Sequence, residues 1–108
     1  MNKLDKLEIS LLNDYYSSLL TDYQAGLIRL YYDDDLSLSE IAELNNITRQ
    51  AALDVINRGT SKLKEFESKL NLVKKTQVLK NEIIKLKTSC DIDTSNKLEN
   101  ILEILEEL

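Results

Sequence analysis

The sequence contains no histidine and no proline, and it has one cysteine, two glycines and few aromatic residues. Without histidine there is no imidazole general base, no histidine metal ligand and no histidine-based catalytic triad. The single cysteine, Cys90, excludes an intramolecular disulfide and a multi-cysteine zinc site. So few glycines and prolines leave too few turn residues for a β-sandwich or an α/β fold. The 108 residues, 43% apolar and 31% charged, therefore predict an all-α globular protein.

Two further absences concern membranes and catalysis. The first ten residues mix charges and lack the apolar core of a signal peptide. No apolar run approaches the roughly 18 residues that span a bilayer. We therefore expect a cytoplasmic protein without membrane insertion. Because the pattern contains no catalytic constellation and no ligand set, we expect no enzymatic activity, no metal site and no cofactor.

Charge is distributed in three blocks along the chain. Residues 1–60 and residues 89–108 each carry a net charge of −5, whereas residues 61–88 hold eight lysines against three glutamates. The overall charge of −5 argues against a general nucleic-acid coat, which would be basic. The acidic ends can neutralise the cationic middle, within the fold or across a dimer. Alternatively, the lysines can form a positive face for a phosphate backbone.

Two capping boxes predict helix starts in the first half of the chain. In each box a hydroxyl covers a free N–H and a side chain three residues later reaches back, and the pairs are Thr21 with Gln24 and Ser37 with Glu40. Thr48 is expected to cap a further helix. The first helix of the chain, before the one that Thr21 caps, is expected over residues 4–19. Its apolar stripe consists of Leu4, Leu7, Leu11, Leu12, Tyr15 and Leu19.

Beyond Gly59 the pattern predicts a long helical arm. A stripe with coiled-coil spacing consists of Leu63, Phe66, Leu70 and Val73. The stripe resumes at Leu79 displaced by one position, so a bend or break is expected between about 71 and 77. Residues 88–94 are expected to form a loop and residues 95–108 a last helix.

Residues 36–58 have the pattern of a helix-turn-helix. Ala42 is small enough for the second helix to cross closely, Asn46 tolerates the positive φ of the turn, and Ile47 can fill the space between the helices. The expected packing residues of the motif are Ile41, Ala42, Asn46, Ile47, Ala52 and Val55.

The opposite face of the second helix is the candidate DNA-binding surface. Arginine and glutamine near the start of a recognition helix can contact purine edges in the major groove. The candidate residues are Thr48, Arg49, Gln50, Asn57 and Arg58, with Arg58 on a phosphate. The same tri-helical unit also serves as a protein-docking module, and Asp54 on this face would repel phosphate. DNA binding and an adaptor role are therefore both open at this point.

Residues 15–58 resemble the YlxM-like family of small bacterial helix-turn-helix proteins, which in turn resemble the promoter-reading fourth region of bacterial sigma factors. The segments that carry the resemblance are Leu19-Leu20-Thr21, Gln24, Leu30-Tyr31-Tyr32, Asp35-Leu36-Ser37, Glu40-Ile41-Ala42-Glu43 and Arg49-Gln50-Ala51. The lysine-rich tail with its final leucine-rich helix also suits this family. The resemblance implies a regulatory role connected with the signal recognition particle pathway, because the family's genes lie beside those of the particle's GTPase and receptor.

The expected architecture is a tri-helical helix-turn-helix head over residues 1–59, followed over residues 60–108 by a helical arm and a final helix. The second part either belongs to the same globular unit or extends it for dimerisation. The apolar stripe that includes Leu63 and Phe66 would need a partner surface, so a homodimer through the arm and the C-terminal helix is expected. A bend near Asn71 would instead let the arm fold back, bury its own stripe and give a monomer. The expected function is a DNA-binding regulatory protein that takes part in the signal recognition particle pathway. The alternative is a protein or RNA adaptor that uses the lysine-rich arm.

Overall fold

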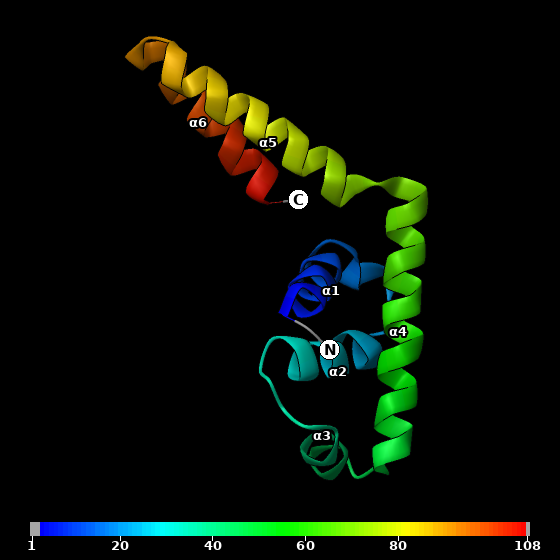
Figure 1. Cartoon of the computed structure of the whole chain (residues 1–108). Helices are drawn as coiled ribbons and strands as arrows, with labels where there is room; N and C mark the ends of the chain where they lie inside the picture. Colours follow the sequence, from blue (N-terminus) through cyan, green and yellow to red (C-terminus); the bar gives the residue numbers. More distant parts are fainter. Residues whose placement is uncertain (1–2, 108) are drawn as a thin grey trace. The chain divides into compact units, whose positions relative to one another are not determined.

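Helices account for nearly all of the described residues, which include no strand. The structure is a computed structural model that describes residues 3–107, with side chains from residue 5 onward (Figure 1). The elements are α1 (Lys3–Tyr16), the 3-10 turn η1 (Ser17–Leu19), α2 (Asp22–Tyr32), α3 (Leu38–Leu44), α4 (Arg49–Leu70), α5 (Leu72–Ser89) and α6 (Ile92–Glu106). The all-α prediction is confirmed. Among the described residues, no helix is both long and apolar enough to cross a membrane.

Both predicted capping boxes are present. The Thr21 hydroxyl accepts a hydrogen bond from the Gln24 N–H at 3.1 Å, and the Gln24 side chain accepts one from the Thr21 N–H at 3.3 Å. Ser37 and Glu40 make the same reciprocal pair, with both bonds at 3.1 Å. These bonds satisfy N–H groups that have no partner within a helix, and they fix the starts of α2 and α3.

The chain divides into two compact units at Asn71, which differs from the predicted division after residue 59. We call residues 1–70 the N-terminal unit and residues 71–108 the C-terminal hairpin. Helix α4 runs through Gly59 without a break, because this glycine has an ordinary negative φ and lies in the middle of the helix. The second helix of the predicted motif and the start of the predicted arm are thus one helix of 22 residues, against which α1, α2 and α3 all pack (Figure 1).

The contact between α2 and α4 is closest at Gly59. A Cβ atom added to Gly59 would lie 2.6 Å from Cδ1 of Ile28 on α2 and 3.6 Å from Cβ of Gln24. Ile28 is completely buried, and Gly59 is buried as well. The small size of glycine therefore suits this position, because a Cβ atom would push against the end of the Ile28 side chain.

The buried face of α1 differs from the predicted stripe. The structure buries Ile9, Leu12 and Tyr16, whereas Leu7 is 62% exposed and Leu19 is 54% exposed. Leu4 of the predicted stripe lies outside the residues whose side chains are described. Leu12 of the predicted stripe is buried and Leu11 and Tyr15 are half-buried, so the prediction is confirmed in part, and it missed the buried Ile9 and Tyr16.

The acidic residues 33–35 lie in the loop between α2 and α3 and connect this loop to α1. The ammonium of Lys6 is 2.7 Å from Oδ1 of Asp35, and the Ser10 hydroxyl donates a hydrogen bond to Asp33 at 2.5 Å. Asp35 adopts a left-handed conformation with φ 56°, and its carboxylate raises the pKa of Lys6 above the ordinary value. The aspartates therefore end α2 and also hold the loop against α1.

Part of the predicted dimer stripe is instead core of the N-terminal unit. Leu63 is completely buried, and the ring of Phe66 packs at 6.0 Å, centroid to centroid, from the ring of Tyr16. The Tyr16 hydroxyl also donates a hydrogen bond to Glu67 at 2.5 Å. The last turns of α4 thus cover α1, which corrects the prediction that Leu63 and Phe66 need a second chain.

The C-terminal hairpin consists of α5 and α6 packed antiparallel (Figure 1). Asn71 interrupts the helical path with a left-handed φ of 56°, which agrees with the break predicted between about 71 and 77. The predicted loop over residues 88–94 is too long, because Asp91 caps α6 by accepting a hydrogen bond from the Thr94 N–H at 2.7 Å. Helix α6 therefore begins at Ile92 rather than at residue 95.

The close contact at Gly59 predicts a non-additive mutational effect. Gly59→Ala should gain about 1 kcal/mol of helix propensity, and this gain is offset by overpacking of about 1–3 kcal/mol against Ile28. In an Ile28→Val background, which lacks Cδ1, the same substitution should stabilise the protein. Urea unfolding of the wild type, the two single variants and the double variant should give a coupling free energy of at least about 1 kcal/mol between the two positions.

Gly26→Ala is the matched control for this cycle, because a Cβ added at Gly26 would meet nothing within 4 Å. It should stabilise the protein equally in both backgrounds. Equal effects of Gly59→Ala in both backgrounds would show that the distance to Ile28 does not determine the residue at this position.

Candidate nucleic-acid interface

Residues 45–48 join α3 to α4 in a tight turn. Asn46 has a left-handed φ of 54°, the Ile47 N–H donates to the Ala42 carbonyl at 3.0 Å, and the Asn46 N–H donates to the Glu43 carbonyl at 3.4 Å. This pair of bonds is the Schellman arrangement that ends a helix at a left-handed residue. The side-chain amide of Asn45 adds a bond to the Ile41 carbonyl at 2.8 Å. The turn therefore has defined geometry, and α4 leaves α3 in a fixed direction.

The sequence-predicted packing residues of this segment lie at different depths. Ile41, Ala42 and Ala52 are buried. Ile47 and Val55 are half-buried, and Asn46 is exposed at the turn. Ala52 and Ile56 direct one side of α4 into the N-terminal unit, and this leaves the other side of its first turns in solvent.

The candidate DNA-binding residues lie in or next to these first turns of α4. The Thr48 hydroxyl accepts a hydrogen bond from the Ala51 N–H at 3.0 Å and so caps the helix. Arg49, Gln50 and Asn57 are exposed. Gln50 and Asn57 are seven residues apart, which is two helical turns, so they lie on the same side of α4.

Arg58 is engaged with an acid on the same helix. Its Nε atom is 3.1 Å from the carboxylate of Asp54, one turn earlier, and both side chains are more than half exposed. An exposed pair of this kind contributes about 0–1 kcal/mol to stability. The predicted phosphate contact of Arg58 would compete with this pair, which at the same time neutralises the carboxylate of Asp54.

Acidic side chains also line α3. Glu40 and Glu43 are exposed on this helix. The pKa of Glu40 lies below its ordinary value of 4.5, because the backbone N–H of Ser37 and, less strongly, the Ser37 hydroxyl hydrogen-bond its carboxylate. Glu40 therefore carries its negative charge at neutral pH, beside the helix that would approach DNA.

Several lysines of the cationic segment are paired with glutamates. Lys69 pairs with Glu65 at 2.9 Å and Lys80 with Glu106 at 3.0 Å. Lys85 pairs with Glu82 at 3.4 Å, and Lys87 pairs with Glu99. At least four of the eight lysines thus have acidic partners, and two of these partners, Glu99 and Glu106, belong to the acidic block at residues 89–108, which favours the interpretation that the blocks neutralise each other.

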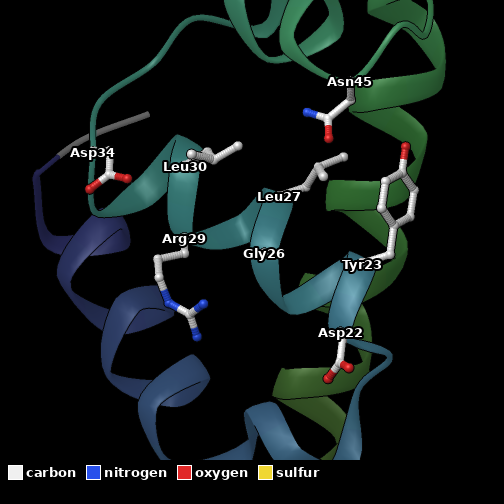
Figure 2. A pocket seen from close by; sticks show the side chains of 8 residues that line it. All are labelled: Asp22, Tyr23, Gly26, Leu27, Arg29, Leu30, Asp34 and Asn45. Atoms are coloured by element: carbon white, nitrogen blue, oxygen red, sulfur yellow. The ribbon is translucent and has the colours of Figure 1, made fainter.

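An open pocket of about 390 Å³ lies along α2 (Figure 2). Figure 2 shows its two carboxylates, Asp22 and Asp34, at opposite ends of the pocket, with the side chains of Tyr23 and Asn45 close to each other at another edge. Carboxylates so placed cannot act as an acid–base pair on one substrate atom. Within residues 3–107, no group of three or more acidic or cysteine side chains is placed to hold a metal ion.

Two positions that shape this region were not among the predicted site residues. Gly59 was interpreted as a boundary, yet it sets the distance between α2 and α4. Asn45, whose amide closes the end of α3, could have been found from the preference of asparagine for helix ends. The sequence around Gly59 carries no signal for this role, because Gly26 lies alone inside a helix in the same way and a Cβ added there would meet nothing within 4 Å.

The sequence matches the family model described as "Putative helix-turn-helix protein, YlxM / p13 like" over residues 2–105. The chain belongs to the UPF0122 family. The resemblance found in the sequence is therefore confirmed, and the α3–turn–α4 segment is the part of this chain that has the helix-turn-helix form.

Individual UPF0122 proteins align over most of the chain. A UPF0122 protein of Clostridium novyi (strain NT) is 40% identical over 105 residues, which are 96% of this chain and 91% of the relative. A UPF0122 protein of Thermoanaerobacter sp. (strain X514) is 42% identical over 105 residues, 96% of this chain and 90% of the relative. A UPF0122 protein of Clostridium botulinum (strain Alaska E43 / Type E3) is 58% identical over 72 residues, 67% of this chain and 66% of the relative.

Ala42 provides a test of the packing between α3 and α4. Ala42→Leu places a larger side chain where only 6% of the alanine is exposed, so overpacking should cost about 1–3 kcal/mol of unfolding free energy. Glu43→Leu is the matched control, because the neighbouring position is exposed and its replacement should change stability by less than about 0.5 kcal/mol. Equal unfolding midpoints for the two variants would contradict this packing.

The capping box of α3 predicts a specific titration. Because the folded pKa of Glu40 is lowered, its contribution to stability is present above pH 4.5 and is lost as the pH falls through the folded pKa. Ser37→Ala removes one of the two hydrogen bonds and should move the Glu40 pKa part of the way back to 4.5. Ser39→Ala, the same deletion two residues further along, should leave it unchanged. Carbon-detected NMR titration of the side-chain carboxyl measures both, and identical pKa values in all three chains would refute the assignment.

Proposed function

We propose that this protein is a regulatory DNA-binding protein in which the first turns of α4 read base edges in the major groove. The observation that carries the proposal is the position of Arg49, Gln50 and Asn57. All three are exposed at the start of a helix whose other side is anchored by buried Ala52 and Ile56. The fixed turn before Thr48 and membership of a helix-turn-helix family support it.

The proposed roles follow from side-chain chemistry. Arg49 can donate two hydrogen bonds to a guanine edge, and the amides of Gln50 and Asn57 can each donate to and accept from an adenine edge. Thr48 caps α4 and so positions these side chains. Arg58 is proposed to neutralise Asp54 in the free protein and to exchange this partner for a phosphate on DNA.

The charges around the proposed interface imply that contacts to phosphates contribute less to DNA affinity than contacts to bases. Within residues 37–59, which hold α3 and the first turns of α4, the basic side chains Arg49 and Arg58 are accompanied by Asp54, Glu40 and Glu43. Few phosphates can then be neutralised, and the dependence of binding on salt concentration should be shallow. Affinity in this proposal comes mainly from base contacts.

An adaptor that uses the lysine-rich segment is the second candidate. It is less well supported, because half of those lysines are paired with glutamates of the same chain. The connection with the signal recognition particle pathway rests on the family resemblance alone and stays a prediction.

The proposal predicts a specific loss of DNA binding. Selection from a random-sequence duplex library with the full chain should enrich one motif. Replacing Arg49 and Gln50 together by alanine should then weaken binding to that motif by about 1–3 kcal/mol for each lost bidentate contact, without loss of helix content.

The control variant removes the same chemical groups elsewhere. Lys62→Ala combined with Gln77→Ala deletes one cation and one amide from exposed positions outside the first turns of α4, and it should bind like the wild type. Enrichment of no motif, or equal binding by both double variants, would contradict major-groove reading by α4. A partner captured from nuclease-treated cytosol would then favour the adaptor role.

A further inference from the structure

The C-terminal hairpin has two broad faces, which can be assigned from burial. The residues of α5 that turn toward α6 are buried or half-buried: Thr76, Lys80, Ile83 and Lys87. The residues of α6 that turn toward α5 are half-buried: Ser95, Leu98, Leu102 and Leu105. The ion pairs Lys80–Glu106 and Lys87–Glu99 set the antiparallel alignment of the two helices.

Four large apolar side chains lie on one of these faces. Leu79 and Leu86 each precede an inward residue of α5 by one position, and Ile101 and Ile104 each precede an inward residue of α6 by one position. One residue turns an α-helix by about 100°. Because the two helices are antiparallel, this backward step leads to the same side of the hairpin in both. The four side chains are 49%, 56%, 44% and 62% exposed, respectively, and we call this surface the Leu79 face.

The opposite face has a different composition. It consists of the residues that follow the inward positions by one, which are Gln77, Asn81, Ile84 and Thr88 on α5 and Asn96, Glu99, Glu103 and Glu106 on α6. Only Ile84 among these eight is apolar, whereas the Leu79 face combines its four apolar side chains with Lys75, Glu82, Thr94 and Lys97. The Leu79 face is therefore the more apolar of the two and the better suited to burial.

The hairpin also buries too little apolar surface to account for its own stability. Among its described residues, Ile83 is the one large apolar side chain that is buried. A unit of 38 residues with so small a core ordinarily needs oligomerisation or another constraint to fold stably. A partner on the Leu79 face would supply the missing apolar contact.

The charges of the hairpin favour a second copy of this chain as that partner. Helix α5 carries five lysines against one glutamate, whereas α6 carries four acids against one lysine. A two-fold axis that lies in the contact plane and runs parallel to the helices places α5 of one copy over α6 of the other. Each cationic helix then lies between two anionic helices, so the surface is complementary to itself.

We propose that the Leu79 face forms a homodimer, in which two hairpins make a four-helix bundle. This dimer lies within residues 60–108, where the sequence predicts dimerisation, but it does not use Leu63 and Phe66, which belong to the N-terminal unit. It is independent of the proposed DNA binding, since it involves other residues and can form without DNA.

The test measures the mass of the full chain by sedimentation equilibrium over a range of protein concentration. The wild type should approach twice the 12.4 kDa of one chain. Leu86→Glu combined with Ile101→Glu places charges on the Leu79 face at exposed positions. This double variant should weaken dimerisation and raise the dissociation constant of the dimer by about tenfold or more. Ile84→Glu combined with Ile92→Glu changes two exposed isoleucines of the same helices outside the Leu79 face, and it should leave the dimer intact.

A second measurement covers the case in which the glutamates unfold the hairpin. Hydrogen exchange of the unmodified wild type should show slower amide exchange in α5 and α6 at high than at low protein concentration, with no such change in α2. A constant mass of 12.4 kDa at all concentrations would overturn the proposal, and the face would then be covered by the chain's own N-terminal unit or by another protein. A dimer that is equally stable in both double variants, or exchange that is independent of concentration, would overturn it as well.

Discussion

The contact between Ile28 and Gly59 determines how the N-terminal unit is assembled. Helix α4 approaches α2 so closely that a single methyl group at Gly59 would meet Ile28. Helix α1 packs against both of these helices, and α3 packs against α4, so each depends on where α2 and α4 cross. The start of α4, which carries the candidate DNA-binding residues, is held in place by the same crossing.

Local signals in the sequence predicted the helix starts well, because capping depends on residues only three positions apart. Thr21, Ser37 and Thr48 all cap helices in the structure. The left-handed position of Asn46 and the break at Asn71 were also predictable, since asparagine tolerates positive φ better than most residues. The capping role of Asp91 was not predicted. In the structure its carboxylate accepts a hydrogen bond from the Thr94 N–H, and this bond lowers the pKa of Asp91.

Features that depend on distant parts of the chain could not be predicted in the same way. The choice between Leu7 and Ile9 as a buried position of α1 is made by the surfaces of α2 and α4. A glycine in the middle of a helix has the same local pattern as a glycine at its end, and only the presence of Ile28 distinguishes them. Of the candidate interface, the exposed first turn of α4 was predictable, whereas the pairing of Arg58 with Asp54 required the positions of both side chains.

Among residues 3–107, the left-handed residues are Asp35, Asn46 and Asn71, all of them non-glycine, and neither glycine has a positive φ. An unfolded chain with asparagine or aspartate at these turns samples fewer backbone conformations than one with glycine. The entropy lost on folding is therefore smaller than it would be with glycine, and this difference offsets part of the steric cost of a left-handed backbone at a residue with a Cβ atom. With no proline in the chain, slow prolyl isomerisation is also absent from its folding. The points where this chain changes direction therefore favour rapid and entropically inexpensive folding.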